Sequence, residues 1–371
     1  EPERFWDSNA AREEDHLVYQ GFVKSEIIRE RVRAMIYPVG VRQMFNFLDV
    51  LDKVSGTLIS FLGPQRQDEW RLRHGPGAIE EEVGPPNKYC WSNWSTALES
   101  EYPIADYGFH SLCSWAGSLC DRFSDGSPSG LQSNGEGSHE PSSRLVAVPK
   151  TYSGPRLIAA EPAAHQWCQQ NIWHYLRSRT SATGIGLFIR FDDQTRNQQL
   201  CREGSRTGHS ATIDLSAASD RVSCHVVGQL FRSNLGLLRS LRSSRTRSVA
   251  QRLAHDVPGL LQLRKFTTMG SACTFPVESL IFLSVALAAV LTQRGRSPSW
   301  ANIRELHREV TVFGDDIIVP IDSRVLFVNA LEVLYFKVNT GKSFWTGLFR
   351  ESCGVDSFRG TDVTPVYWRR V

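Results

Sequence analysis

Apolar residues recur at helical spacing in three segments of the chain. In residues 25–62, 165–179 and 325–336 they stand three or four positions apart, and this pattern predicts a helix in each segment. The third helix is expected to end near Asn339–Gly341, because asparagine and glycine are common just past a helix C-terminus.

A fourth helix is predicted over 275–292, where apolar residues follow one another almost without interruption. Thr274 suits its N-cap and Pro276 its first turn. The apolar run from Leu280 to Leu291 is too short to span a bilayer and follows Glu278 closely, so we expect neither a membrane span nor a membrane partner.

Shorter apolar runs between turn residues predict strands. They lie at 144–149, 156–160, 211–215, 310–313 and 317–319. The first two flank a turn at 153–155, the third runs into a helix over 217–235, and the last two form a tight hairpin around Gly314-Asp315-Asp316. Strands that alternate with helices in this way predict an α+β fold, with helices packed on a sheet.

Glycine, serine, proline and asparagine crowd the segment 124–143, which reads SDGSPSGLQSNGEGSHEPSS. Such a segment buries no core, so we expect a mobile surface loop. HGPGA at 74–78 and GPP at 84–86 are further loop signals.

The composition excludes several classes of protein. Of 371 residues, 41% are hydrophobic and 22% are charged, which excludes a mainly disordered, collagenous or coiled-coil chain. The eight cysteines form no CxxC pair, so we expect a reducing, intracellular compartment rather than a disulfide scaffold. No charged-then-apolar leader opens the chain, and its start at Glu1 rather than methionine suggests a fragment.

The net charge of +3 implies no polyanionic partner, but its distribution is uneven. Arginine outnumbers lysine 35 to 7, and residues 151–255 hold fourteen arginines against six acids. Forked arginine contacts suit a channel for a phosphate backbone. A solvated, arginine-rich face has the same composition, so charge alone leaves both interpretations open.

Asp315 and Asp316 are the strongest chemical signal in the chain. Adjacent carboxylates at a hairpin tip repel each other, and a bound divalent cation relieves that repulsion, although an ordinary Asp-Asp turn has the same sequence. Asp214 ends a predicted strand, where a buried carboxylate is costly unless it is paired or binds a metal. If that strand pairs with the 310–319 hairpin, the aspartates meet at one point and could hold two Mg²⁺ ions for in-line phosphoryl transfer.

Two further features are consistent with phosphate chemistry. The small-residue loop Met269–Thr274, with Gly270 and Ser271, lets backbone approach a phosphate or a sugar, although a plain loop and cap would look alike. Lys150 and Arg156 flank a turn and could grip a triphosphate, although surface cations beside turns are common.

Asp220 follows Asp214 at the expected start of a helix, where the helix dipole also favours an acid. The sequence gives no support for a dinucleotide-binding, P-loop or α/β-hydrolase protein, because it lacks GxGxxG after a strand, GxxxxGK[ST] and GxSxG.

Taken together, five blocks resemble successive motifs of viral RNA-dependent RNA polymerases. They are VPKTYSGPRLIAAEP at 148–162, ATIDLSAASDRVS at 211–223, TTMGSACTFPVESLIF at 267–282, VFGDDIIVP at 312–320 and FRESCG at 349–354. Further agreement comes from HGPGA at 74–78, DDQTRNQQL at 192–200, NTGKSF at 339–344 and DVTPVYWRR at 362–370. The chain most resembles the replicase (beta) subunit of positive-strand RNA bacteriophages, the levivirus family; narnavirus, mitovirus and botourmiavirus polymerases fit the FRESCG and DVTP blocks less well.

The resemblance implies a right-hand polymerase fold with fingers, a palm of antiparallel sheet plus helices, and a thumb. It predicts an N-terminal region and fingers over 1–205, a palm over 206–236 and 266–348, a fingers–palm connection over 237–265, and the start of a thumb over 349–371. Because such relatives continue well beyond the position of Val371, the thumb is expected to be truncated.

The resemblance also implies roles for single residues. The catalytic, metal-binding aspartates are Asp214, Asp315 and Asp316. The residues around the incoming nucleotide are Lys150, Arg156, Asp220, Gly270, Ser271 and Thr274. Lys342 matches a palm lysine that could protonate the departing pyrophosphate.

Two substitutions depart from the family pattern. Ser271-Ala272 replaces the usual Asn-Gly, which bears on sugar discrimination and loop mobility. Arg221 follows Asp220 where a serine is usual, which adds a cation beside the nucleotide site.

The resulting prediction is an RNA-directed RNA polymerase, a nucleotidyltransferase that copies a phage RNA genome in the cytoplasm of a bacterial host. Its expected cofactor is a pair of Mg²⁺ ions, with Mn²⁺ as a substitute. Its expected partners are RNA template and product, nucleoside triphosphates, host elongation factors Tu and Ts, and a ribosomal protein. One alternative is a reverse transcriptase-like polymerase, against which Asp220 argues because a bulky steric gate is expected there. The other is an inactive relative that only binds RNA, against which the intact aspartates argue.

Overall fold

The computed structural model describes residues 40–65, 69–71, 73–81, 88–89, 91, 93–109, 140–151, 154–253 and 258–366. The predicted helical residues 25–39, the loop at 84–86, most of the 124–143 segment, part of the 153–155 turn and residues 367–370 lie outside these ranges. The chain divides into two compact units. Unit 1 holds the described residues of Pro64–Leu176 and Leu235–Thr274, and unit 2 those of Glu14–Gly63, Arg177–Asn234 and Phe275–Val371.

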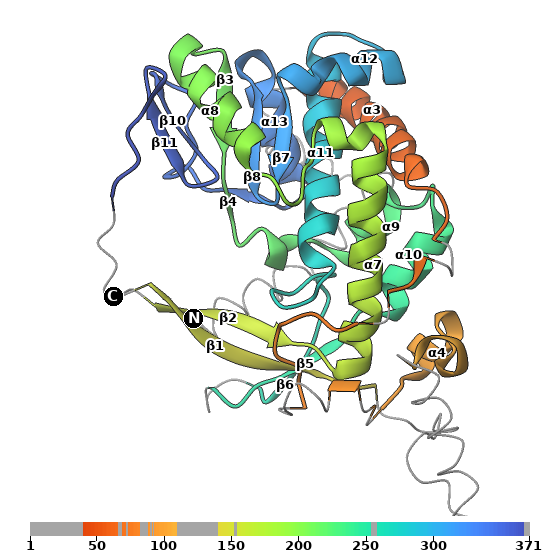
Figure 1. Ribbon diagram of the computed structural model, residues 1–371. Helices are drawn as coiled ribbons and strands as arrows, with labels where there is room; N and C mark the ends of the chain where they lie inside the picture. Colours follow the sequence, from red (N-terminus) through yellow and green to blue (C-terminus); the bar gives the residue numbers. More distant parts are fainter. Residues whose placement is uncertain are drawn as a thin grey trace, which may run out of the picture. The chain divides into compact units, whose positions relative to one another are not determined.

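Unit 1 contains a four-stranded sheet in the order β2-β1-β5-β6 (Figure 1). Its strands are β1 (Ser143–Thr151), β2 (Gly154–Ala160), β5 (Ser248–Ala250) and β6 (Leu260–Gln262). β1 and β2 are antiparallel, with Val146 opposite Ile158, which confirms the strand pair predicted around the 153–155 turn. Leu145, Ala159, Val249 and Leu263 pack together as an apolar cluster on this sheet.

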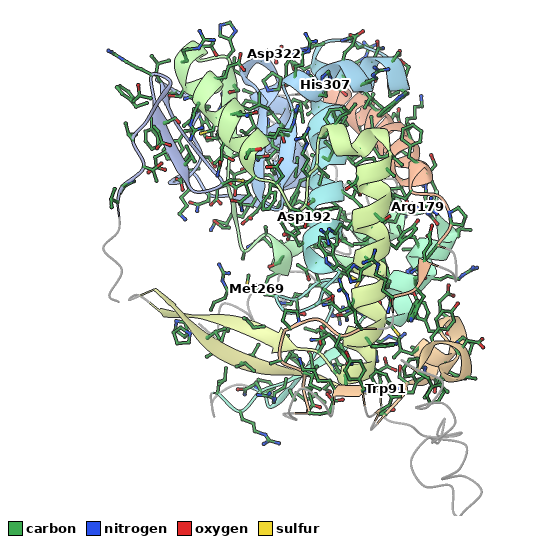
Figure 2. All side chains as sticks on the ribbon, viewed as in Figure 1. Trp91, Arg179, Asp192, Met269, His307 and Asp322 are labelled. Carbon is green, nitrogen blue, oxygen red and sulfur yellow. The ribbon has the colours of Figure 1, made fainter. Side chains whose placement is uncertain are left out.

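The helices of unit 1 are α4 (Thr96–Glu101), α5 (Ile104–Tyr107), α10 (Leu235–Ser243) and the first part of α7 (Ala163–Ala182). α7 confirms the helix predicted over 165–179. Its Trp167 is fully buried in an aromatic cluster with Trp91, Tyr89 and His74, and Figure 2 labels Trp91 there. Burial lowers the pKa of His74 to about 4, so this partly buried histidine is neutral at pH 7.

Unit 2 is organised by a three-stranded sheet in the order β3-β8-β7, antiparallel throughout. β3 spans Ser210–Ile213, β7 Thr311–Phe313 and β8 Asp316–Pro320, which confirms the predicted hairpin and its neighbouring strand. α8 (Thr195–Thr207) packs against all three strands. A second sheet of β10 (Phe349–Ser352), β11 (Val355–Phe358) and β12 (Thr361–Asp362) also contacts α8.

The remaining helices of unit 2 are α3 (Val41–Phe61), α9 (Cys224–Leu230), α11 (Thr274–Gln293), α12 (Trp300–Glu305) and α13 (Arg324–Val333). Short 3-10 turns lie at Gly184–Leu187, Ser219–Arg221, Leu306–Arg308 and Ile321–Ser323. With mixed sheets and helices in both units, the predicted α+β class is confirmed.

α11 is the sole helix of the described ranges that is long and apolar enough to cross a membrane, although 94% of its apolar window is buried inside the protein. It is therefore a core helix by its packing. Pro276 lies in its first turn as predicted, but Thr274 is the first helical residue rather than the N-cap. The Thr274 hydroxyl donates to the carbonyl of Thr268 at 2.6 Å and so ties the helix start to the preceding loop.

The helix predicted over 217–235 is wrong for most of its length. Ala217 has a φ of 51°, a left-handed conformation that cannot continue a right-handed helix. A 3-10 turn follows, and α9 begins only after Ser223, whose hydroxyl accepts a hydrogen bond from the Val226 amide. Because alanine rarely adopts this conformation, the apolar pattern gave no sign of the break.

The helix predicted over 325–336 also ends earlier than expected. Tyr335 has a φ of 66°, which ends the helical path after Val333. The chain then forms β9 (Lys337–Val338), which pairs with β4 (Leu215–Ser216). Asn339–Gly341 thus follows a strand and does not end the helix.

Candidate active site

Two strands of unit 2 place an aspartate at the same end of the β3-β8-β7 sheet. Ile213, the last residue of β3, lies opposite Ile317 of β8, so Asp214 follows β3 where Asp316 begins β8. Asp315 lies in the turn between β7 and β8. The strand predicted at 211–215 therefore pairs with the hairpin, as a shared site for the aspartates requires.

The loop after β9 holds Asp214 through both its main chain and its side chain. The amide of Asp214 donates to Oγ of Ser343 at 3.0 Å, and the amide of Asn339 donates to the Asp214 carbonyl at 2.9 Å. Nδ2 of Asn339 donates to Oδ2 of Asp214 at 2.8 Å. The NTGKSF block thus positions the first aspartate, a role that its sequence did not disclose.

Asp214 lies in a negative electrostatic environment. Its pKa is raised to about 6, chiefly by burial and to a smaller extent by the charges of Asp315 and Asp316. The hydrogen bond from Asn339 and the charge of Lys342 act in the opposite direction. Lys342, the predicted proton donor, is exposed and lies within electrostatic reach of the aspartates.

A tight turn presents Asp315. Gly314 has a φ of 62°, and a Cβ there would lie 2.8 Å from the ring of Phe275. Its amide donates to Oγ of Ser279 at 3.0 Å, which ties the turn to α11. Glycine is required at this position for both the conformation and the space.

Asp316 is held by a second turn, between β10 and β11. The amide of Cys353 donates to Oδ1 of Asp316 at 3.1 Å, and the hydroxyl of Ser352 donates to the same oxygen at 3.3 Å. Cys353 and Gly354 have φ values of 49° and 71°, the left-handed pair that a two-residue hairpin turn needs. The FRESCG block therefore contributes a hydrogen-bond donor to a predicted metal ligand.

α8 fixes this turn from the other side. Nδ2 of Asn197 donates to the carbonyl of Asp316 at 3.1 Å, and its Oδ1 accepts from Oγ1 of Thr311 at 2.8 Å. Nε2 of Gln198 donates to the carbonyl of Cys353 at 3.1 Å. The DDQTRNQQL block thus links the Asp316 strand to the β10–β11 turn.

Glu278 is a buried acid beside this site that the sequence analysis treated only as a charge near an apolar run. Burial raises its pKa well above the usual value, and the charges of Asp315 and Asp220 act in the same direction. Its Oε2 has no hydrogen-bond partner among the described residues. A lone acid within an apolar helix was the available signal for this residue.

Asp220 lies in the 3-10 turn Ser219–Arg221 and is half-buried. Its effect on the pKa of Glu278 places it in the same acidic neighbourhood. Nη1 of Arg221 donates to the Tyr335 carbonyl at 3.1 Å, so part of this unusual arginine supports the turn before β9.

No three histidine, cysteine, aspartate or glutamate side chains in the described ranges converge closely enough to hold a metal ion by themselves. Mg²⁺ usually keeps several waters and takes one or two carboxylates together with substrate phosphates. Asp214, Asp315 and Asp316 supply carboxylate oxygens, and a divalent cation would relieve the repulsion that raises the pKa of Asp214. The donor chemistry therefore fits Mg²⁺ or Mn²⁺.

The other predicted nucleotide-binding residues lie in unit 1. Lys150 belongs to β1, and Arg156 is exposed on β2 opposite Val148. Gly270 and Ser271 lie in the loop before α11, where Figure 2 labels Met269. Gly270 has a φ of 131°, and a Cβ there would lie 2.0 Å from the Ala159 carbonyl oxygen, so the loop approaches β2 where only glycine fits.

Acids of the protein pair with several arginines of the 151–255 segment. These pairs include Arg177–Asp192, Arg190–Asp193, Arg202–Asp362 and Arg247–Glu140. Nη2 of Arg245 donates to the carbonyls of Leu263 and Lys265 at 2.5 and 2.8 Å, so this arginine supports the local backbone. Much of the arginine excess thus has a structural use, while Arg156 and Arg242 are exposed.

Comparisons with known proteins identify a matching family and several relatives. The family model for RNA replicase, beta-chain, matches residues 126–371. The RNA-directed RNA polymerase beta chain of Enterobacteria phage GA is 36% identical over 228 residues, which are 61% of this chain and 38% of that protein. The RNA-directed RNA polymerase subunit beta of Escherichia virus Qbeta is 37% identical over 233 residues, 62% of this chain and 36% of that protein.

The chain therefore spans little more than a third of the length of these curated relatives. Among solved structures, the insertion loop deletion mutant of the RNA-dependent RNA polymerase of a human picorbirnavirus aligns with a TM-score of 0.42 and 13% identity. That alignment covers 61% of this chain and 47% of the other, and the likeness is too low to support an argument.

Proposed function

Because the chain belongs to the RNA replicase beta-chain family, we propose that it carries out template-directed RNA synthesis, as an RNA-directed RNA polymerase of an RNA phage. The reaction is the attack of a growing strand's 3′-hydroxyl on the α-phosphate of a nucleoside triphosphate, with release of pyrophosphate. In this proposal the β3-β8-β7 sheet with α11 and α13 belongs to the palm. The fingers, palm and thumb boundaries stay as predicted from the sequence.

The observation that carries the proposal is the position of three aspartates at one end of the β3-β8-β7 sheet. Asp214, Asp315 and Asp316 would hold two Mg²⁺ ions, with Mn²⁺ as a substitute. Bound there, such ions would stabilise negative charge that develops on the reacting phosphate. The charges of Asp315 and Asp316 contribute to the raised pKa of Asp214, and a bound cation would offset that repulsion.

The remaining residues of the proposal bind the nucleotide or transfer a proton. Lys150 and Arg156 would bind the triphosphate, and Lys342 would protonate the leaving pyrophosphate. Asp220, together with Gly270, Ser271 and Thr274, would contact the ribose. These roles rest on the family motifs, and the exposure of Arg156 and Lys342 is consistent with them.

An incorporation assay tests the proposed function directly. The purified chain is offered an RNA or a DNA template, with ribonucleotides or deoxyribonucleotides, in Mg²⁺, in Mn²⁺ or in a chelator. The proposal expects ribonucleotide incorporation on RNA that the chelator abolishes. Synthesis of DNA would favour the reverse transcriptase alternative, and RNA binding without synthesis would favour the inactive relative.

RNA template, RNA product and nucleoside triphosphates are the partners that this activity requires. Elongation factors Tu and Ts and a ribosomal protein stay as partners predicted from the resemblance, as does a place in the bacterial cytoplasm. Co-purification of the tagged chain from bacterial cells tests the host factors, because each would be retained at a fixed stoichiometry after high-salt washing.

A further inference from the structure

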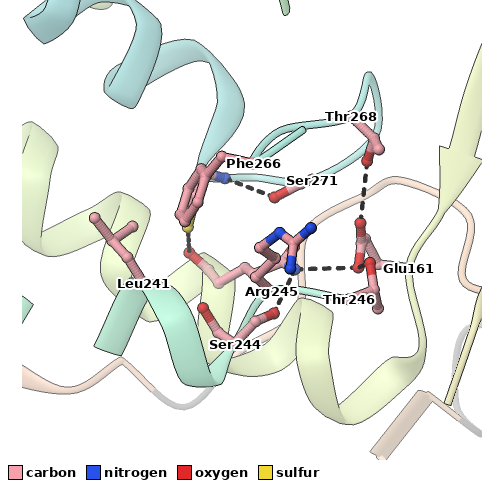
Figure 3. Close-up of a pocket in the computed structure, with 10 residues that line it drawn as sticks. Glu161, Leu241, Ser244, Arg245, Thr246, Phe266, Thr268 and Ser271 are labelled. Carbon is pink, nitrogen blue, oxygen red and sulfur yellow. Dashed lines mark hydrogen bonds between the residues drawn. The ribbon is translucent and has the colours of Figure 1, made fainter. Parts of the chain in front are cut away.

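Glu161 is a fully buried acid at the end of β2, and the proposed reaction does not use it. Only 1% of its surface is exposed. Its Oε2 accepts hydrogen bonds from Oγ1 of Thr246 at 2.8 Å and from Nε2 of Gln169 at 3.2 Å. Its Oε1 accepts from Oγ1 of Thr268 at 3.3 Å (Figure 3). One carboxyl group thus joins α7, through Gln169 eight residues on, to Thr246 and Thr268, which follow 85 and 107 residues after Glu161.

Gln169 of α7 extends this network to the loop before α11. Its Nε2 also donates to the carbonyl of Ser244 at 2.8 Å, while its Oε1 accepts from the Ala272 amide at 3.3 Å. Sγ of Cys273 lies 3.7 Å from the Gln169 carbonyl, as a weak donor. Glu161 and Gln169 therefore contact the loop Thr268–Cys273 at both of its ends.

The middle of the same loop is fixed against β2. The amide of Ala159 donates to the Met269 carbonyl at 2.7 Å. The close approach of Gly270 to the Ala159 carbonyl leaves no room for a side chain there. The loop is thus held along its length by β2 and by Glu161 and Gln169, which follow β2 in the sequence.

The cavity beside the network is too small for a substrate. Its volume is about 10 Å³, and its lining includes Glu161, Gln169, Arg245 and Ser271. Oγ of Ser244, which also lines it, has no hydrogen-bond partner among the described residues. A single water would fill this space, so the cluster binds no nucleotide itself.

Burying a carboxyl group costs free energy, because the group is removed from water, and an apolar residue at this position would avoid that cost. We therefore ask what Glu161 contributes in return. Burial raises the pKa of Glu161 to about 7, which reflects that cost. Three donors converge on it from separate segments, and one of them, Thr268, begins the loop. Glu161 thus connects the loop by hydrogen bonds to the rest of unit 1.

We propose that Glu161, with Gln169, is a positioning residue that holds the loop Thr268–Cys273 in the conformation that contacts the sugar of the incoming nucleotide. The inference rests on the proposed function, which places Gly270 and Ser271 at the nucleotide. Glu161 acts through the loop and does not touch the substrate.

A pair of matched variants tests the proposal. Thr268→Val and Thr246→Val each remove one hydroxyl donor to Glu161 at a site that is 3% exposed, but only Thr268 belongs to the loop. Hydrogen exchange at the Ala272 and Cys273 amides is measured on the full chain without substrate, and KM and kcat are measured for ribonucleotides and deoxyribonucleotides.

We expect Thr268→Val to speed exchange at Ala272 and to raise the ribonucleotide KM by about fivefold, the effect of losing one hydrogen bond. The preference for ribonucleotides falls, while kcat changes little. Thr246→Val leaves the loop exchange and KM near the parent values, although both variants lose similar thermal stability. Equal exchange rates and equal KM values in the two variants would overturn the proposal.

Glu161→Gln provides a rescue test. Glutamine keeps the length of the side chain, accepts from Thr246 and Gln169, and can donate to Oγ1 of Thr268. The ribonucleotide KM of Glu161→Gln should therefore stay within about twofold of the parent value. The KM of Glu161→Leu should rise at least as much as that of Thr268→Val. If the parent chain incorporates no nucleotide, the proposed function fails, and the exchange data alone decide whether Glu161 holds the loop.

Discussion

The backbone amide of Cys353 donates a hydrogen bond to Oδ1 of Asp316 at 3.1 Å, across 37 residues of sequence. A donor on Oδ1 restricts the rotation of the carboxylate. Hydrogen bonds donated to a metal-binding carboxylate commonly orient it in this way. The β10–β11 turn is therefore part of the candidate active site, although it lies outside the β3-β8-β7 sheet.

The first prediction concerns the left-handed turn that carries this amide. Gly354→Ala should destabilise the protein by about 1 kcal/mol, because alanine resists a φ of 71°. Since the turn also holds Asp316, incorporation should fall by more than the loss of folded protein explains. Gly347→Ala is the matched control, with a φ of 60° and no atom near the added Cβ. Thermal unfolding and incorporation are measured for both, and equal activities would contradict the role of the turn.

The second prediction concerns pH and stability. The folded-state pKa of Glu161 is about 7 against an ordinary value of 4.5, because burial favours the neutral acid. Its contribution to stability is complete below pH 4.5 and is lost as the pH rises through 7. Relative to Glu161→Gln, the parent should lose about 3 kcal/mol of unfolding free energy across that window. Denaturant unfolding of both proteins from pH 5 to 8 measures the difference, and parallel curves would refute a buried, titrating Glu161.

The third prediction concerns the exposed Arg156 on β2. Arg156→Ala should raise the apparent KM for nucleoside triphosphates by about tenfold, the effect of losing a charge-assisted hydrogen bond to phosphate. Its RNA affinity should stay unchanged. Nucleotide titrations beside filter binding of RNA measure both quantities. A variant with normal KM would remove Arg156 from the triphosphate site.

The fourth prediction concerns two arginines that we expect to affect RNA affinity and not the KM for nucleotides. Arg242 is exposed, and Arg247 is half-exposed and lies 3.8 Å from its acidic partner Glu140, which leaves it accessible to RNA. Replacing both by alanine should weaken RNA binding and flatten its salt dependence by about two units of slope at most. Arg245 is left in place because it supports the backbone at Leu263 and Lys265. The KM for nucleotides should stay near the parent value. An unchanged salt slope would mean that these two arginines lie on a solvated face away from RNA.

The sequence predicted those parts of the fold where local pattern and local structure agree. Apolar runs around Gly314-Asp315-Asp316 gave the hairpin, because a turn of glycine and aspartates between such runs has few other solutions. The same pattern failed after β4, where Ala217 takes a left-handed conformation that its side chain does not favour. Local pattern thus located the aspartates but not the segment that carries Asp220.

The hydrogen bonds that hold the aspartates in place could not be predicted from the sequence, for a different reason. Cys353 contacts Asp316 through its main chain, and Asn197 contacts the same strand across 119 residues. Backbone donors have no sequence signature, and contacts at such separation depend on how the elements pack. Glu278 is the exception, since an acid within an apolar helix is visible in the sequence and is buried beside Asp315.

The measurement that tests the account most directly is Mg²⁺-dependent ribonucleotide incorporation by Asp315→Asn and Asp214→Asn, with Asp322→Asn as the control. Asp322 lies just beyond β8 and pairs with Arg294, 3.0 Å away on the surface. Each active-site variant removes one metal-binding carboxylate with little change of shape, so incorporation should fall by about 100-fold or more while thermal unfolding stays near that of the parent. The control should keep the parent activity. Near-normal incorporation by either active-site variant would contradict the assignment of these aspartates as the catalytic centre.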